Sequence, residues 1–200
     1  MLHNSISEPE NHKYFKIYKP DGYLSQFIYN QKKRQKKKLL GELGDFPEAT
    51  MAVGRLDEPS EGLLLLTTDG KASYRITSTG LEKEYHVQVD GLITDAAMRE
   101  LQNGVEISIY GKPYQTKPCQ VERLSLPENL PKRNKKIRDE RHGPTSWIRV
   151  IITEGKYRQV RKMTAKINFP TLRLVRYWID DITIVDLQKG EVKEISSFRQ

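Results

Sequence analysis

The chain has 200 residues, of which 36% are hydrophobic and 30% charged, as in a single globular domain with a heavily charged surface. Its 34 Lys and Arg residues against 26 Asp and Glu give a formal charge of +8, which favours a polyanionic partner over an ordinary basic surface. The longest apolar run, residues 63–66, is far shorter than the ~20 residues of a membrane span, so we expect no membrane partner. The single cysteine, Cys119, excludes an internal disulfide, and we expect it to serve packing.

Residues 1–12 are polar and lack the basic-then-apolar pattern of a secretory signal, so we expect a flexible tail on a cytoplasmic protein. Residues 13–200 are expected to form one domain, beginning with a strand over 14–20 that ends at a proline. The dense basic run 32–38 is either a solvated loop or an arm that contacts RNA phosphates. The charge of the whole chain favours the arm, with Lys36, Lys37 and Lys38 as RNA-binding residues.

The middle of the chain carries clear local signals. Four consecutive leucines within 62–68 predict a strand that is buried on both faces. Asp69 follows as the expected cap of a helix over 71–78. Residues 84–89 alternate, which puts Tyr85, Val87 and Val89 on one face of a strand.

The second half of the chain predicts further mixed elements. A helix is expected over 95–103, with Gly104 suited to the left-handed αL position, followed by strands over 105–109 and 114–124. Residues 127–144 are basic and proline-containing, which predicts a mobile loop. A strand over 147–153, a helix over 157–168 and a strand over 172–179 follow. Because strands and helices do not alternate regularly, the pattern predicts an α+β fold.

Most of the usual signs of catalysis are missing from the sequence. The 4 histidines have no metal-ligand spacing, and no glycine-rich nucleotide loop occurs, so we expect no metal and no cofactor. One candidate remains in the turn Gly54-Arg55-Leu56-Asp57 beside the leucine strand. Considered without further information, an aspartate beside an arginine is more readily a structural ion pair than a catalytic group.

A second candidate is the helix expected over 157–168. Arg158 and Arg161 are three residues apart and therefore share a face at its N-terminal end. Two guanidinium groups that point the same way could bind phosphate or hold a carboxylate ionised. A solvated helix face is the alternative.

Four motifs in order resemble those of one enzyme family. Residues 53–67 are similar to the aspartate signature of the small-subunit-type (RsuA-like) pseudouridine synthases, and Lys19-Pro20 resembles that family's opening motif. Residues 83–87 resemble its tyrosine motif, and 154–163 with 172–176 resemble its last motif. Residues 54–57 alone are weak evidence for this family, whereas four motifs in the family's order across residues 14–184 are strong evidence. The sequence of residues 169–176 is most similar to that of the E type, which acts on 23S rRNA of the large subunit. The E type lacks an N-terminal S4 RNA-binding domain, and we expect none before Tyr14 here.

The resemblance implies the pseudouridine synthase catalytic fold, a mixed and mostly antiparallel sheet in two lobes around a central cleft. It also implies an isomerase that breaks the N1–C1′ bond of a uridine in 23S rRNA, turns the base and joins C5 to C1′, as a monomer without metal or cofactor. The target uridine must leave its stack to reach the enzyme's carboxylate.

The same resemblance assigns roles to individual residues. Asp57 is the expected catalytic carboxylate, either attacking the nucleotide or assisting departure of the uracil. Tyr85 is expected to stack on the target base, and Arg161 to pair with Asp57. Leu174 would pack beneath the site. The remaining expected RNA contacts are Arg55, Arg158 and Arg176.

Two other function classes compete with this interpretation. One is an RNA-binding assembly factor on the same fold without catalysis, which the intact Asp57, Tyr85 and Arg161 argue against. The other is a nucleoside hydrolase or glycosidase, which would need a metal or a second positioned carboxylate. The sequence shows neither of these.

Overall fold

The structure is a computed structural model that describes residues 12–29, 37–127, 130–133, 135–138 and 140–198. The expected tail, apart from His12, and Lys36 with most of the basic run therefore lie outside the described residues. Within these ranges, no helix combines the length and the apolar character needed to cross a membrane.

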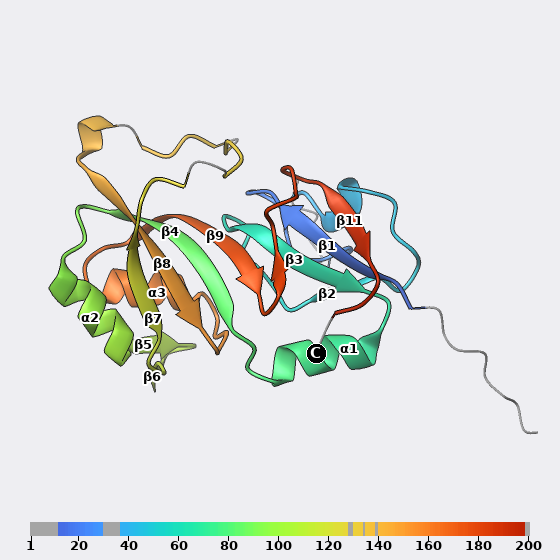
Figure 1. Ribbon diagram of the computed structural model, residues 1–200, viewed down its shortest axis with the longest axis horizontal. Helices are drawn as coiled ribbons and strands as arrows, with labels where there is room; N and C mark the ends of the chain where they lie inside the picture. Colours follow the sequence, from blue (N-terminus) through green and yellow to red (C-terminus); the bar gives the residue numbers. More distant parts are fainter. Residues whose placement is uncertain (1–11, 30–36, 128–129, 134, 139, 199–200) are drawn as a thin grey trace, which may run out of the picture.

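The described residues form one sheet of nine strands and a separate two-stranded hairpin (Figure 1). The strands are β1 (Tyr14–Lys19), β2 (Met51–Val53), β3 (Glu61–Thr67), β4 (Lys83–Asp90), β5 (Glu106–Ile109), β6 (Lys112–Gln115), β7 (Gln120–Leu124), β8 (Thr145–Ile152), β9 (Thr171–Ile179), β10 (Ile182–Thr183) and β11 (Val192–Ile195). The helices are α1 (Gly70–Ser78), α2 (Asp95–Asn103) and α3 (Gln159–Lys166), with short 3₁₀ turns at η1 (Leu40–Glu42) and η2 (Glu140–His142).

The large sheet runs through both halves of the molecule in the order β11-β1-β3-β9-β4-β8-β7, with β2 paired to β3 and β10 to β9. Each pairing that the described strands make is antiparallel except that of β3 with β9, which is parallel. In Figure 1, α1 lies with β1, β2, β3 and β11 in one half, and α2 and α3 lie with β4, β7 and β8 in the other. The expected mixed, mostly antiparallel α+β fold is confirmed.

Strand β3 is buried along its whole length because both faces of the sheet are covered there. Leu64 and Leu66 pack into the core that contains β4, α2 and α3 residues, whereas Leu63 and Leu65 pack into the second core on the opposite face, with α1. The prediction of a doubly buried strand is confirmed. Asp69 caps α1 as expected, because its carboxylate accepts hydrogen bonds from two backbone amides of the first turn.

The segment after α2 departs from the sequence prediction. Gly104 ends α2 with a positive φ of 85°, but its ψ of 147° lies outside the expected αL region. The cause is a close approach, since a Cβ at Gly104 would lie 2.3 Å from the carbonyl oxygen of Thr116. The expected strand 114–124 is divided, because β6 pairs with β5 while β7 joins the large sheet beside β8.

Candidate active site

A pocket of about 490 Å³ opens where the two halves of the sheet meet. Its wall is formed by the 53–57 turn, the end of α1, strands β4, β8 and β9, and the segments 114–117 and 153–160. This volume lies within the range of ordinary small-molecule sites. Six residues singled out from the sequence line it: Arg55, Asp57, Tyr85, Arg158, Leu174 and Arg176.

Two arginines converge on the Asp57 carboxylate. Nη1 of Arg158 lies 3.6 Å from Oδ2 of Asp57, and Nε of Arg161 lies 3.9 Å from the same oxygen. These are ion-pair distances, longer than hydrogen bonds. The Asp57 side chain is 22% exposed, so the carboxylate stands at the boundary between the protein and the open pocket.

Arg158 and Arg161 both lie near Asp57, but they do not share a helix face as predicted, because α3 begins later than expected. The helix begins at Gln159, two residues later than expected, because Arg158 is its N-cap in a left-handed conformation with φ 53°. Arg161 lies one turn further and does not line the pocket, so it contacts Asp57 from behind. Burial, followed by the neighbouring charge of Arg158, lowers the pKa of Arg161 to about 10.

The loop that carries Asp57 is held by hydrogen bonds to its backbone. The Ser25 hydroxyl accepts from the Leu56 amide at 3.0 Å and donates to the Leu56 carbonyl at 2.8 Å. On the other side of Asp57, the Glu58 carbonyl accepts from the Gly22 amide at 2.8 Å and from Nζ of Lys19 at 3.4 Å. The aspartate is therefore fixed by polar contacts to both of its chain neighbours.

Arg161 and a further arginine, Arg133, hold the next peptide of this loop. The Pro59 carbonyl accepts from Nη2 of Arg161 at 3.3 Å and from Nη2 of Arg133 at 3.1 Å. Nε of Arg133 lies 3.3 Å from Asp21 and 3.4 Å from Glu61. Arg133 comes from the basic segment 127–144, for which the sequence predicts a mobile loop throughout. Part of that segment is instead anchored beneath the aspartate loop.

Glu61 is the centre of a buried ionic cluster under the pocket. Its two oxygens accept from Nε and Nη2 of Arg173, each at 3.0 Å, and Nη2 of Arg173 also donates to the Pro131 carbonyl at 2.7 Å. The fork-to-fork geometry is the strong form of an arginine–carboxylate pair. It joins β3, β9 and the basic segment at one point.

Tyr85 and Leu174 lie on the neighbouring strands β4 and β9 and form the apolar part of the pocket. Both side chains are buried in the core on one side and reach the pocket on the other. A tyrosine ring beside a leucine provides a flat apolar surface against which a pyrimidine base could lie. This is the place that the sequence predicts for both residues.

Arg176 is more deeply buried than a surface RNA contact would be. Its Nε donates to the Leu63 carbonyl at 2.8 Å, while its Nη2 has no hydrogen-bond partner within the described part of the chain. Gly62 makes this position possible, because a Cβ there would lie 2.3 Å from the Arg176 carbonyl oxygen. Arg176 lines the pocket, but this Nη2 atom is itself buried, so its unpartnered N–H lies behind the pocket wall.

Two of the three expected RNA-binding lysines, Lys37 and Lys38, lie beside the aspartate loop and outside the pocket lining. Nζ of Lys37 binds both carboxylate oxygens of Glu58, at 2.6 and 2.9 Å. Nζ of Lys38 lies 5.3 Å from the centre of the Tyr23 ring. Lys36 is outside the described residues. The role of these lysines in binding RNA stays a prediction.

Lys19 is the buried lysine of the expected opening motif. Its Nζ donates to the carbonyls of Pro20 at 2.9 Å and Tyr23 at 2.8 Å, besides the longer contact to Glu58. Burial lowers the pKa of Lys19 to about 7. Its role cannot be predicted from the sequence, because a single lysine before a proline carries no information about its contacts.

Comparison with known proteins places this arrangement in a family. Residues 13–166 match the RNA pseudouridylate synthase family. The chain belongs to that family. The resemblance drawn from the four motifs is thereby confirmed.

Among relatives of this pseudouridine synthase, a ribosomal large subunit pseudouridine synthase E of Vibrio vulnificus is 43% identical over 89% of the chain and 73% of the relative. A protein of the same name from Xanthomonas campestris is 41% identical over 86% of the chain and 90% of the relative. A solved structure of a pseudouridylate synthase superposes with a TM-score of 0.71, at 27% identity, over 94% of this chain and 72% of that one.

Two remaining sequence predictions concern metal and cysteine. Throughout the described residues, no three His, Cys, Asp or Glu side chains gather as a metal site would require. Cys119 packs against the core and its thiol donates to the Leu101 carbonyl at 3.2 Å. Burial raises the pKa of Cys119 to about 11, which keeps the thiol protonated. Its expected packing role is confirmed.

Proposed function

We propose that this pseudouridine synthase isomerises a uridine in large-subunit (23S) rRNA, with Asp57 as the catalytic carboxylate. The substrate is supported by the similarity to two proteins named large subunit pseudouridine synthase E. The observation that carries the role of Asp57 is its position: a half-buried carboxylate in the pocket, within 4 Å of two arginines and on a loop whose backbone is held on both sides.

The reaction needs one carboxylate and a surface that turns the base. The N1–C1′ bond breaks, the uracil rotates, C5 bonds to C1′, and the proton on C5 is lost as N1 becomes an N–H group. Asp57 acts at C1′, by covalent attack or by stabilising the positive charge that develops as uracil departs. Both routes need an ionised carboxylate, and Arg158 and Arg161 each place a positive charge within 4 Å of it.

The other pocket residues hold the base and the ribose phosphate. Tyr85 provides a stacking surface for the displaced uracil, with Leu174 beside it on β9. Arg176, which also lines the pocket, is a candidate to contact a phosphate or to support the site. Arg55, on the turn before Asp57, is exposed and suited to a phosphate.

The catalytic domain is proposed to span residues 13–200, beyond the 13–166 of the family match. The reason is that β9 and β11 both belong to the large sheet, and β9 contributes Leu174 and Arg176 to the pocket. We propose that the enzyme acts as a monomer. Its substrate would place it in the cytoplasm, with the ribosomes.

The test replaces the carboxylate and follows loss of the C5 hydrogen. Asp57→Asn should fold, bind rRNA with near-normal affinity and release no tritium from RNA that contains 5-tritiated uridine. Asp95→Asn, the same change at an exposed position of α2, should retain full release. Near-normal release by Asp57→Asn would contradict the assignment. Mapping pseudouridine in large-subunit rRNA from cells with and without the gene identifies the target.

A further inference from the structure

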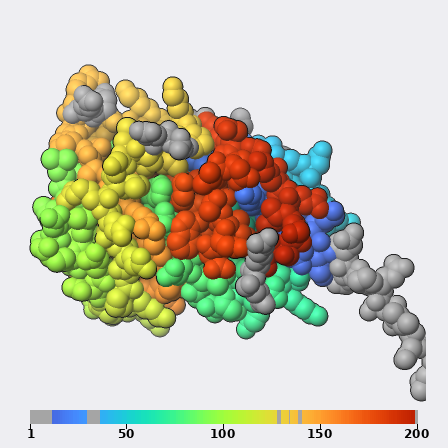
Figure 2. All heavy atoms as spheres, viewed as in Figure 1, coloured from blue at the N-terminus to red at the C-terminus, as the bar shows by residue number. Residues whose placement is uncertain are grey.

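Two tyrosines stack on each other at the surface, between the β5–β6 hairpin and the start of α3. The ring centres of Tyr110 and Tyr157 are 5.4 Å apart and their planes differ by 17°. Tyr110 is 80% exposed and Tyr157 51% exposed, so the pair covers only part of its ring surface. Figures 1 and 2 show the hairpin at an outer edge of the molecule, where a large partner could reach it.

The backbone of Tyr110 is in a conformation that disfavours tyrosine. Tyr110 and Gly111 join Ile109 to Lys112 in a two-residue turn, with φ values of 51° and 80°. Such turns favour Asn-Gly, because both central residues have positive φ. A bulky residue at positive φ costs about 1 kcal/mol or more, and such outliers cluster at functional sites. Asparagine would be less strained at this position, so the turn itself does not require a tyrosine.

One lysine lies over a ring of the pair, and a second lies over a neighbouring ring, that of Tyr114. Nζ of Lys162 lies 5.1 Å from the centre of the Tyr157 ring and donates to the Ser108 carbonyl at 2.6 Å, which ties α3 to β5. Nζ of Lys156 lies 5.1 Å from the centre of the Tyr114 ring. Exposed aromatic faces interleaved with lysines are the usual surface for single-stranded nucleic acid, since bases stack on the rings and phosphates meet the charges.

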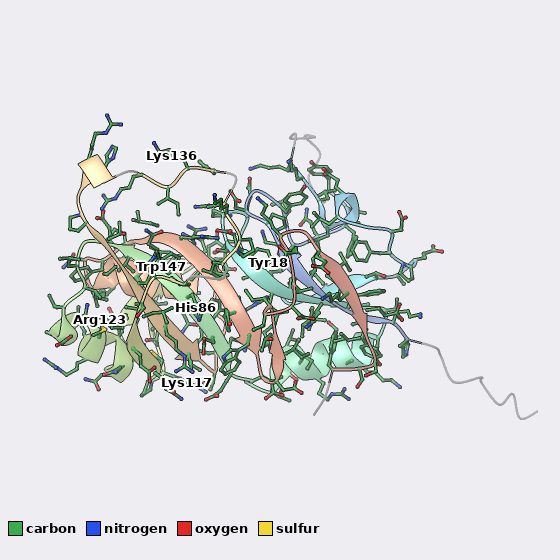
Figure 3. All side chains as sticks on the ribbon, turned by 45° about the horizontal axis from the view of Figure 1, so that its top comes forward. Tyr18, His86, Lys117, Arg123, Lys136 and Trp147 are labelled. Carbon is green, nitrogen blue, oxygen red and sulfur yellow. The ribbon has the colours of Figure 1, made fainter. Side chains whose placement is uncertain are left out.

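This surface adjoins the pocket. Lys156 and Arg158, the chain neighbours of Tyr157, both line the pocket, as do Tyr114 of the hairpin and Lys117. Figure 3 places Lys117 at the opposite side of the molecule from Lys136 of the basic segment. The tyrosine pair is therefore a feature of the pocket rim, on the side of Lys117 and away from Lys136.

We propose that Tyr110 and Tyr157 form a platform on which an unpaired base of the RNA, next to the target uridine, stacks as a third ring. Lys156 and Lys162 contact the phosphates of that nucleotide. This inference rests on the proposed function, because it assumes that the uridine enters the pocket. Stacking tolerates any base, so the platform would hold the flanking strand in place without reading its sequence.

The test removes the tyrosine rings by substitutions that should leave the fold intact. Tyr110→Asn suits the positive φ and should leave the thermal unfolding temperature unchanged or higher, while it removes the ring. Tyr157→Ala removes the second ring. The probe is an rRNA stem-loop with 2-aminopurine at the unpaired position beside the modified uridine, whose fluorescence falls when that base stacks.

The double variant should bind this RNA about 5- to 100-fold more weakly and lose the fluorescence change. The single-turnover rate at saturating RNA should stay within about twofold of wild type, because these rings do not touch the uracil. Tyr110→Phe and Tyr157→Phe should retain both binding and quenching. Tyr74→Ala, which removes a tyrosine that is 75% exposed on α1, is the matched control and should bind normally.

Each outcome has one meaning. Unchanged affinity and quenching in the double variant would overturn the platform, even if wild type forms pseudouridine normally. A wild type that binds the RNA through the platform but forms no pseudouridine would overturn the proposed function alone. Binding and quenching are both measured without turnover, so the two failures are distinguishable.

Discussion

Nε of Arg161 lies 3.9 Å from Oδ2 of Asp57, but the same guanidinium is closer to the backbone that carries this aspartate. It lies 3.3 Å from the Pro59 carbonyl and 3.2 Å from the Ser60 hydroxyl. Arg161 therefore fixes the position of the loop and places a positive charge beside the Asp57 carboxylate. Because its pKa is lowered only to about 10, it remains charged at neutral pH.

Arg161→Lys should separate charge from geometry. A lysine keeps the positive charge but cannot reproduce the fork that binds Pro59 and Ser60 together. We expect the single-turnover rate to fall about 100-fold, since a displacement of about 1 Å at a reacting group costs that much. RNA affinity should change less than about threefold, because Arg161 does not line the pocket. Tritium release at saturating RNA measures the rate, and a fall smaller than about threefold would contradict the positioning role.

Arg158→Lys is the companion to that variant. Arg158 is more exposed than Arg161 and reaches Asp57 from within the pocket. Water and a lysine can replace more of its interaction, so we expect a smaller fall in rate, of about tenfold. If the rate falls equally in both variants, the loop contacts of Arg161 contribute nothing beyond its charge.

Ser25 should contribute to both stability and activity, because it makes two hydrogen bonds to the loop that carries Asp57. Ser25→Ala leaves the buried N–H and carbonyl of Leu56 without their partner, which should lower the free energy of unfolding by about 1–3 kcal/mol. The looser Asp57 should also reduce the single-turnover rate. Urea unfolding measures the first effect. Ser196→Ala, at an exposed position after β11, should change stability by less than about 0.5 kcal/mol.

Features with a local sequence signal, such as β3, could be predicted, whereas contacts between distant residues, such as that of Ser25, could not. The leucine run and the cap at Asp69 are local signals, so the strand and α1 are predicted close to their observed bounds. The Ser25 contact spans 31 residues and the Arg133 contact spans 74, and neither leaves a local period. Asp57 is identified through a family motif, whereas the side chains that hold its loop are visible only in the folded chain.

Lys36, Lys37 and Lys38 should raise RNA affinity through their charge. Replacing Lys36, Lys37 and Lys38 by Ala should weaken RNA binding. The slope of log K against the logarithm of the salt concentration should become shallower by roughly one unit for each phosphate that is no longer neutralised. The rate at saturating RNA should barely change. The comparison is Lys13→Ala, a lysine that pairs with Glu194. A triple variant with unaltered affinity and salt slope would show that this segment is only a solvated loop.

Lys19 should make stability depend on pH above neutrality. Its pKa is about 7 in the folded protein and about 10.4 in an unfolded chain. Between these values the unfolded state binds one more proton than the folded state, so the free energy of unfolding rises with pH. Lys19→Met fills a similar volume without a titrating group. Between about pH 7.5 and 9.5, the free energy of unfolding of the wild type should therefore rise relative to that of the variant by roughly 1 kcal/mol per pH unit.

Urea unfolding of both proteins at several pH values across this window measures the difference directly. Tyrosines and other lysines titrate in the same range, but they are common to both proteins and cancel when the two free energies are subtracted. The variant also lacks the hydrogen bonds of Nζ to Pro20, Tyr23 and Glu58, which lowers its stability at every pH without changing the slope. Parallel curves with a constant offset would therefore mean that Lys19 keeps its ordinary pKa and acts only through these hydrogen bonds.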